Sequence, residues 1–365
     1  MKRRNFFVLS VLSCFAFPDK PVSCEPYGGG HIHDTRLVAC RGGETFILQR
    51  INTHVFTEPV LLMRNIERVC AHLRKKTDDP RQVLSLVPAR DGRPFAVENG
   101  GYWRVFRFVE NSICFDHADA ALFYESGAAF GQFLTLLADF PVHELAETIP
   151  HFHDTPARFA ALRAATEEDP LMRARGVQRE LSFALRYEAF AHTLTDLAAE
   201  GELPLRVTHN DTKINNVLFD QATRKALCVI DLDTVMPGLC ATDFGDAVRF
   251  GASTAAEDEP ELDFVHFDIA LFKSFASGYL SACGDSLSET ETAMLPTGAR
   301  MMALENGVRF LTDYLSGDRY YHISRPGQNL ERARTQFRLL EEMDVREPEM
   351  RAIIAEIMLQ RRGVR

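Results

Sequence analysis

The chain has 365 residues, 46% of them hydrophobic, so it can bury a large core and has the length of about two domains. Its 41 Lys and Arg residues are outnumbered by 51 Asp and Glu residues, which gives a formal net charge of -10. This balance, without any long basic run, argues against a nucleic-acid partner and against binding to an anionic membrane. The eight cysteines have no paired spacing, so we expect reduced thiols and neither a disulfide framework nor a zinc site.

The N-terminal segment begins like a secretory signal, because three basic residues precede an apolar run over residues 6–17. However, no small-residue cleavage site follows, and Pro18-Asp19-Lys20 ends the run early. We therefore expect the first helix or strand of the domain here, and a cytoplasmic protein. No other apolar segment approaches the ~20 residues that cross a bilayer, so we expect no membrane span.

The front of the chain predicts a small sheet with one long helix. Residues 35–51 indicate two short strands joined by a tight turn at Gly42-Gly43. Residues 58–76 have apolar side chains at helical spacing. Residues 83–87 and 102–109 then predict two more strands on either side of a turn-rich stretch.

The remainder is mostly helical. Apolar periodicity predicts helices over residues 118–140 and about 177–200, with a connection rich in Pro and His over residues 141–156. Short strands return over residues 205–231, and the chain after Asp263 is expected to be mostly helical.

This change of pattern near residue 110 predicts the fold class. Strands before it and helices after it indicate an α+β protein with two lobes. We expect a small β-rich N-terminal lobe over residues 1–110 and a larger, mainly helical C-terminal lobe over residues 111–365.

The most informative stretch is a polar loop followed by a hairpin. Apolar runs over residues 217–219 and 227–230 flank a polar turn, so they should pair as antiparallel strands. If the turn is centred near Thr223, Val217 faces Ile230, and the polar residues just outside this pair also face each other.

Those polar residues are Asn216 and Asp231, which would lie ~5 Å apart at Cα and could share one cation. Five residues earlier, Asp211 offers a further carboxylate. Phosphoryl transfer needs one carboxylate to accept the proton of the acceptor hydroxyl and oxygen ligands to hold Mg²⁺ on the nucleotide phosphates. The alternative is a set of ordinary turn and cap residues, but their number and order favour the catalytic interpretation.

The stretch resembles the aminoglycoside phosphotransferase and choline kinase superfamily, which has a protein-kinase-like fold. The superfamily pattern H-x-D-x-x-x-x-N runs here from His209 to Asn216, and a D-x-D follows the hairpin at Asp231-Leu232-Asp233. The resemblance implies that Asp211 is the catalytic base and that Asn216 and Asp231 are magnesium ligands. It makes Asp233 a third candidate ligand.

Further segments resemble the N-acetylhexosamine 1-kinases. They cover residues 27–35, 46–56, 209–216, 230–238, 243–251 and 305–314. Members of that family transfer the γ-phosphate of ATP to the anomeric hydroxyl of N-acetylglucosamine or N-acetylgalactosamine. The resemblance therefore implies ATP and Mg²⁺ as cofactors and a small sugar, an N-acetylhexosamine first of all, as the acceptor.

For the nucleotide, the candidates are a glycine run and one arginine. Successive glycines at Gly28-Gly29-Gly30 let backbone N–H groups approach phosphates, although such a run is often only a turn. Arg50 stands on the third strand, where a kinase usually has a Lys, and can grip a phosphate with two hydrogen bonds. Glu67 on the following helix is its candidate partner, with a solvated surface residue as the alternative.

For the acceptor, the resemblance points to a set of five residues, each of which could also be structural: His31, Asp34, Phe250, Arg309 and Tyr320. His33 and Arg36 stand where the family pattern H-I-N-D-T-Y has Asn and Tyr, which leaves the fine specificity open.

The remaining polar motifs are expected to be structural. Asp243-Phe244-Gly245 looks like the D-F-G of protein kinases but follows the hairpin too late to supply a metal ligand. We expect Asp243 and Asp246 to support the catalytic loop through hydrogen bonds. The other histidines show no metal-binding spacing and are expected to be ordinary: His117, His143, His151, His153 and His192.

Three other functions stay open at this point. One is a kinase for another small alcohol, such as an aminoglycoside, choline or homoserine. Another is a nucleotide-binding pseudokinase, against which the presence of Asp211 and Asp231 argues. The third is a secreted sugar-binding protein, for which only the N-terminal apolar run argues.

Overall fold

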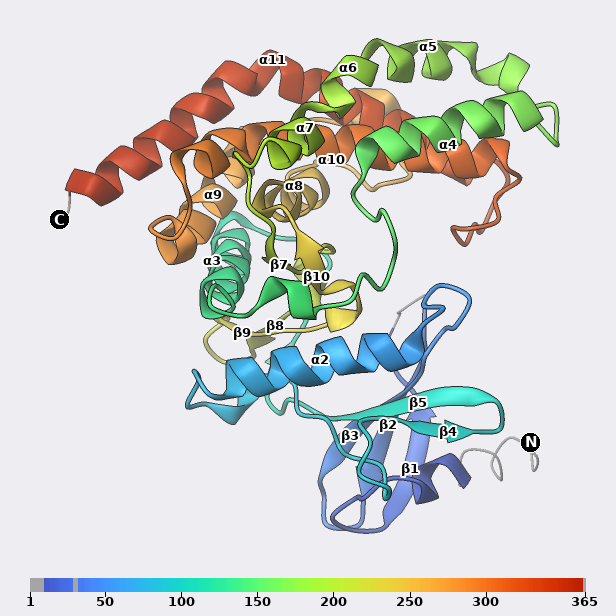
Figure 1. Cartoon of the computed structure of the whole chain (residues 1–365), viewed down its shortest axis with the longest axis vertical. Coiled ribbons are helices and arrows are strands. Elements are labelled where there is room, and N and C mark those ends of the chain that lie inside the picture. Colours follow the sequence, from blue (N-terminus) through green and yellow to red (C-terminus); the bar gives the residue numbers. More distant parts are fainter. Residues whose placement is uncertain (1–9, 29–31, 364–365) are drawn as a thin grey trace.

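The strands of the front half form one antiparallel sheet in the order β1-β2-β3-β5-β4 (Figure 1). The computed structural model describes residues 10–28 and 32–363. Gly43, at the turn between β2 and β3, has a φ of 91°, which glycine adopts without strain. The strands are β1 (Pro21–Pro26), β2 (Asp34–Cys40), β3 (Thr45–Arg50), β4 (Ala96–Glu98) and β5 (Gly101–Arg107).

One expected strand is not formed. Residues 83–87 follow a 3-10 turn, η1 (Pro80–Gln82), and make only one isolated bridge, between Leu86 and Phe106. The backbone N–H of Val87 still bonds to the carbonyl of Val105 at 2.8 Å. The segment is extended and partly buried, but its pairing with the end of β5 is too short to make a ladder.

The two faces of this sheet have different neighbours. Phe46 and Leu48 of β3 pack on the outer face with Val11, Leu12 and Phe15 of the N-terminal segment, in which residues 10–13 are helical. The inner face, to which Ile47 belongs, is covered by helix α2 (Pro59–Arg74). In Figure 1, α2 lies between the sheet and the strands of the C-terminal lobe.

The C-terminal lobe contains two short sheets that border α2. β6 pairs with β8, which pairs with β9, and β7 pairs separately with β10. Their bounds are β6 (Ser112–Ile113), β7 (Arg206–Thr208), β8 (Val217–Asp220), β9 (Ala226–Val229) and β10 (Met236–Gly238).

Helices make up the rest of this lobe. The helix expected over residues 177–200 is broken into three, α5, α6 and α7, and none of the helices in the described chain is both long and apolar enough to cross a bilayer. The helices are α3 (Ala120–Leu136), α4 (Thr155–Glu168), α5 (Gln178–Arg186), α6 (Glu188–Ala191), α7 (Thr193–Ala199), α8 (Cys240–Gly251), α9 (Ile269–Cys283), α10 (Glu289–Leu315) and α11 (Gln328–Gly363). The remaining 3-10 turns are η2 (Val142–Glu144), η3 (Ala174–Val177), η4 (Ile214–Asn216), η5 (Leu232–Thr234) and η6 (Leu262–Phe264).

Two glycines bring α8 and α10 into close contact. A Cβ on Gly245 would collide with the carbonyl of Gly298, and a Cβ on Gly298 would collide with the carbonyl of Ala241. Because only hydrogen fits between these backbones, α8 is fixed against the long helix α10. This packing determines where the acidic side chains of α8 lie.

The lobes share an apolar core. Ile66 and Val69 of α2 belong to the same buried cluster as Phe133 of α3, Val207 of β7 and Val235, which follows η5. Apolar burial of this kind contributes about 25 cal/mol per Å². The lobes are therefore held together by packing as well as by polar contacts.

The predicted hairpin is present, but its register is one residue off the expectation. Val217 pairs with Val229 rather than Ile230, and the N–H of Ile230 bonds to the carbonyl of Asn216 at 2.9 Å. Asp231 therefore lies beyond the last pair of the ladder, where its φ of 60° turns the chain into η5.

Candidate functional site

The loop between β7 and β8 presents Asp211 together with two polar side chains. The amide nitrogen of Asn216 donates to both Oδ2 and the backbone carbonyl of Asp211, at 2.9 and 2.8 Å. The Nζ atom of Lys213 lies 2.8 Å from Oδ1 of Asp211. The Asp211 side chain is 27% exposed, so it is accessible to a small molecule.

The charge of Lys213 keeps Asp211 ionised. Burial by itself would raise the pKa of Asp211, but the ion pair with Lys213 outweighs burial and lowers this pKa to about 2. The same pair raises the pKa of Lys213 against the effect of burial. At neutral pH the site holds a carboxylate and an ammonium group in contact.

Two buried carboxylates of α8 accept hydrogen bonds from the backbone of the catalytic loop. Oδ2 and Oδ1 of Asp243 accept the backbone N–H groups of His209 and Asn210, at 2.8 and 2.6 Å. Oδ2 of Asp246 accepts the N–H of Thr212 at 3.0 Å. These bonds confirm the expectation that both carboxylates support the loop.

His153 also supports this loop, although the sequence indicated an ordinary histidine. Its Nε2 lies 3.0 Å from the carbonyl of Asn210 and its Nδ1 lies 2.8 Å from Oε1 of Glu305. Both partners are acceptors, so both ring nitrogens must donate and the imidazole is charged. Burial opposes this charge, but Glu305 raises the pKa of His153 above its ordinary value.

Asn216 and Asp231 present oxygen atoms suited to a hard cation. Because the amide nitrogen of Asn216 is committed to Asp211, its amide oxygen is left as the ligand atom. Burial, and after it the negative charges of Asp233 and Asp211, raise the pKa of Asp231 well above its ordinary value. A divalent cation would offset this accumulation of negative charge.

The described residues do not form a ready-made metal cage, since no three His, Cys, Asp or Glu side chains gather around one point. Proteins usually hold Mg²⁺ through one or two carboxylates plus the phosphates of a substrate. Asp231 could supply such a carboxylate oxygen, and Asn216 could supply an amide oxygen beside it.

Asp233, expected as a third metal ligand, is placed differently. Its Oδ1 accepts from Nη1 of Arg104, and its Oδ2 accepts from Nη2 of Arg104 at 2.7 Å. Oδ2 also lies 2.9 Å from Nε2 of His33. Burial would raise the pKa of Asp233, but Arg104 and His33 lower it below its ordinary value. Both oxygens are committed to protein cations or donors rather than to an open metal position.

On the nucleotide side, the structure separates the expected pair of Arg50 and Glu67. Arg50 follows Phe46 and Leu48 on the outer face of β3 and stacks on Trp103 at 5.9 Å, whereas α2 covers the inner face. Glu67 is exposed on α2. The two side chains therefore lie on opposite sides of the sheet and do not form the expected pair.

The glycine-rich turn connects β1 to β2. Gly28 has a φ of 74°, a conformation that favours glycine. Gly29, Gly30 and His31 lie outside the described residues. Asp34, the first residue of β2, is 45% exposed and forms an ion pair with Arg36 at 3.2 Å.

On the acceptor side, Phe250 and Arg309 lie among aromatic and cationic groups. The Phe250 ring has Nζ of Lys213 5.9 Å from its centroid, so it borders the catalytic loop. The guanidinium of Arg309 lies 5.1 Å from the ring centroid of Phe152 and 5.7 Å from that of Tyr321. Tyr320 is 55% exposed, and its ring contacts Tyr321.

Comparison with known proteins agrees with this geometry. A family model described as the phosphotransferase enzyme family (APH) matches residues 23–276. The chain belongs to this family. It is an ATP-dependent small-molecule kinase of the aminoglycoside phosphotransferase and choline kinase superfamily.

Several solved structures have a similar fold, and each match covers nearly the whole of this phosphotransferase. An aminoglycoside phosphotransferase from Alicyclobacillus acidocaldarius has a TM-score of 0.59 and 12% identity, covering 96% of this chain and 95% of that chain. Amicoumacin kinase bound to AMP-PNP and Ca²⁺ has a TM-score of 0.61 and 12% identity, and the match covers 94% of this chain and 95% of that chain. Choline kinase from Cryptosporidium parvum has a TM-score of 0.57 and 13% identity, with 92% of this chain and 93% of that chain covered. At these identities the likeness shows the shared two-lobed fold.

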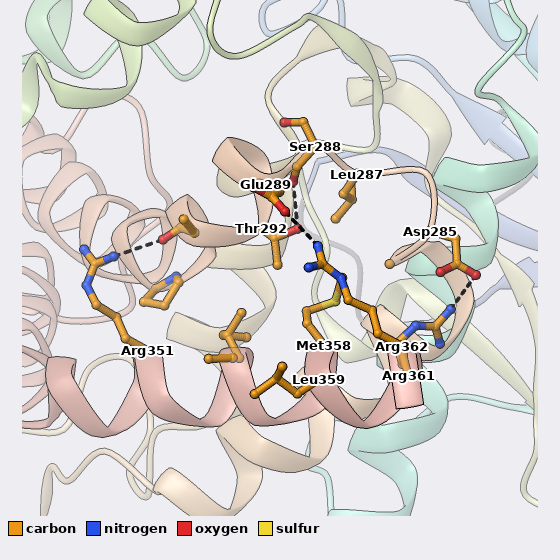
Figure 2. Close-up of a pocket in the computed structure, with 15 residues that line it drawn as sticks. Asp285, Leu287, Ser288, Glu289, Thr292, Arg351, Met358, Leu359, Arg361 and Arg362 are labelled. Atoms are coloured by element: carbon orange, nitrogen blue, oxygen red, sulfur yellow. Dashed lines mark hydrogen bonds and ion pairs between the residues drawn. The ribbon is translucent and has the colours of Figure 1, made fainter. Parts of the chain in front are cut away.

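A cavity of about 550 Å³ lies elsewhere in this kinase, between the start of α10 and the end of α11. Figure 2 shows Arg361 pointing toward Asp285 and Arg362 toward Glu289, while Arg351 bonds to the backbone of α10. None of the expected site residues that the structure describes lines it. The cavity is therefore separate from the catalytic loop.

Lys213, His153 and Arg104 were missing from the expected site. Lys213 stands two residues after Asp211 in the same motif, and this proximity alone was a usable signal. Arg104 is a charged residue in the middle of the strand β5, and Tyr102 and Phe106, which share its face, are aromatic. A charged residue in such a strand needs a buried partner. His153 gave no signal, because its partners lie far away in sequence.

Proposed function

We propose that this kinase transfers the γ-phosphate of ATP to the anomeric hydroxyl of an N-acetylhexosamine and releases a sugar 1-phosphate and ADP. The observation that carries the proposal is the environment of Arg309. Among the described residues, Arg309 has no ion-pair partner, since the nearby Glu305 is paired with His153, and its guanidinium lies over the rings of Phe152 and Tyr321. Aromatic faces together with free guanidinium donors suit a neutral ring that carries hydroxyl and amide groups.

The same environment disfavours cationic acceptors. Burial, and after it repulsion by the charge of Arg309, lowers the pKa of Arg158, a second cation nearby. Glu305, the nearby acid, is already bonded to His153 and Thr155. An acceptor with a quaternary ammonium or several amino groups would add positive charge without gaining a free carboxylate.

Asp211 orients the acceptor in this proposal. Its ionised carboxylate accepts a hydrogen bond from the anomeric hydroxyl and directs the oxygen lone pair at the γ-phosphorus. The new O–P bond forms as the bond between the γ-phosphorus and the bridging oxygen of ADP breaks. The hydroxyl proton passes to Asp211 late in this step, which suits a carboxylate of low pKa. Lys213 then faces the negative charge of the transferred group.

Asn216 and Asp231 would hold Mg²⁺, which would offset the negative charge of the nucleotide phosphates. Asp243, Asp246 and His153 keep the loop that carries Asp211 in one conformation. Because ATP is the donor, we place the reaction in the cytoplasm.

A coupled ADP-release assay with Mg-ATP and a panel of free sugars, choline and an aminoglycoside tests the proposal. We expect release with N-acetylglucosamine or N-acetylgalactosamine and none with their methyl glycosides, because methylation blocks the anomeric hydroxyl. Release only with another acceptor would keep the mechanism and replace the substrate. Binding of ATP without release for any acceptor would indicate a pseudokinase.

A further inference from the structure

One carboxylate of the C-terminal lobe, Asp233, collects donors from several parts of the N-terminal lobe. Arg104 of β5 forms a two-bond ion pair with it, and both side chains are nearly buried, at 2% and 3% exposure. The Nε of Arg104 also donates to Oε1 of Gln49 on β3 at 2.9 Å. The ion pair thus connects the central strands of the sheet to η5.

His33 adds a third bond whose direction can be worked out. The backbone N–H of Asn52 donates to Nδ1 of His33 at 3.1 Å, so this nitrogen carries no proton. The neutral ring must then carry its proton on Nε2, which donates to Oδ2 of Asp233 at 2.9 Å. The ring is also stacked on Phe56, with 5.6 Å between centroids. His33 directly precedes β2, so this bond connects the start of β2 to η5.

On the other side, the backbone around Asp233 is tied to the catalytic loop. The carbonyl of Asp233 accepts from Oγ1 of Thr148 at 3.0 Å. The Oγ1 of the next residue, Thr234, donates to the carbonyl of His209 at 2.7 Å, and the backbone carbonyl of Thr234 accepts from Nδ2 of Asn210 at 2.9 Å. A continuous set of bonds therefore runs from the sheet, through η5, to the loop that carries Asp211.

We propose that Arg104 and His33 clamp Asp233, so that Asp233 is a positioning residue between the lobes and not a metal ligand. The clamp fixes η5, and with it Asp231, relative to β5 and to the start of β2. Since phosphoryl transfer depends on the alignment of nucleotide and acceptor, loss of the clamp lowers the rate of transfer more than the binding of either substrate.

The variants His33→Asn and His33→Gln form a matched pair for this test. An Asn amide can replace Nδ1 as the acceptor for Asn52 but does not reach Asp233, whereas a Gln amide can replace Nε2 as the donor. We expect kcat to fall about tenfold in His33→Asn, the effect of one lost bond to a charged group, and about threefold or less in His33→Gln. The acceptor KM should be unchanged in both. Equal kcat values in the two variants would overturn the role of His33.

A magnesium titration separates a clamp from a metal ligand. Arg104→Gln and Asp233→Asn should lower kcat to a similar extent, and the double variant should be no slower than either one, because both remove the same contact. Any change in this activity's half-maximal Mg²⁺ concentration should be the same in all three variants, because each releases η5 and Asp231 in the same way. If Asp233→Asn alone raises this concentration, Asp233 is a metal ligand and the proposal fails.

Two further measurements keep the test decisive. If a single variant does not fold, Arg104→Met combined with Asp233→Leu removes both buried charges at once, a change that proteins often tolerate. A folded double variant with the kcat of the wild type would overturn the clamp.

The kinetic readouts rest on the proposed function, which fails separately if the wild type releases no ADP with any acceptor. In that case, the losses of Tm in Arg104→Gln and Asp233→Asn decide: non-additive losses support the clamp and additive losses refute it.

Discussion

Replacing Asp243 by Asn tests how a buried carboxylate holds the catalytic loop. Burial raises the pKa of Asp243 to about 6, even though His209 and Asn210 donate their backbone N–H groups to it. The difference between about 6 in the folded chain and 3.8 in the unfolded chain corresponds to about 3 kcal/mol. The folded state therefore binds the proton of Asp243 more tightly than the unfolded state does.

The sign of the pH effect follows from this difference. Above pH 6 the folded chain carries a buried charge, which costs about 3 kcal/mol of unfolding free energy relative to the protonated form. As the pH falls from about 6 toward 4, this cost disappears and the contribution of Asp243 to stability improves. Between pH 7.5 and pH 5 the improvement should be roughly 1.5 kcal/mol. In Asp243→Asn this part of the pH dependence should be absent.

Urea unfolding of the wild type and of Asp243→Asn at pH 5 and pH 7.5 measures the effect. The exposed Asp196 on α7, with 67% of its side chain accessible, supplies the control variant Asp196→Asn. The same pH dependence in wild type and Asp243→Asn would refute the reasoning. The activity of Asp243→Asn should fall. The NH₂ group of the Asn amide cannot accept a hydrogen bond from a backbone N–H, so one of the two loop bonds is lost and kcat should fall about tenfold or more at neutral pH.

Three other substitutions probe the site directly. Asp211→Asn should lower kcat at least ~100-fold in the ADP-release assay and leave nucleotide binding intact, and near-normal turnover would remove Asp211 from the mechanism. Lys213→Met removes the charge that lowers the pKa of Asp211, so the acid limb of the kcat profile should move to higher pH; an unmoved limb would show that Lys213 does not control this carboxylate. Arg309→Met should raise the acceptor KM about tenfold or more without changing the KM for ATP, whereas a rise confined to ATP would place Arg309 at the nucleotide.

The parts of the site that lie close together in sequence could be predicted. The motif from His209 to Asn216 locates the catalytic loop, and the acids at Asp243 and Asp246 hold it as expected. The hairpin was also predictable, but its register was not. Oδ1 of Asp220 accepts the N–H of Thr223, and the ladder shifts next to Phe219, so the pairing moves by one residue.

The contacts between lobes could not be derived from sequence, because they depend on which face of the sheet meets α2. Alternation places Arg50 and Gln49 on opposite faces of β3, but periodicity does not say which face is the inner one. The structure places Gln49 on the side of Arg104, and the strand pairing sets these two residues opposite each other. The inward cation is therefore on β5, 54 residues after the position expected for it.

The backbone conformation of the catalytic loop accounts for the buried acids around it. Asn210 has a φ of 63°, and the N–H groups of consecutive loop residues point away from any strand partner. Buried N–H groups need acceptors, and in this loop carboxylates supply them where a sheet would supply carbonyls. A carboxylate accepts two such bonds at once, as Asp243 does, but its charge is costly to bury. The loop thus gains a fixed conformation at the cost of stability, and substitutions at these acids should affect catalysis more than folding.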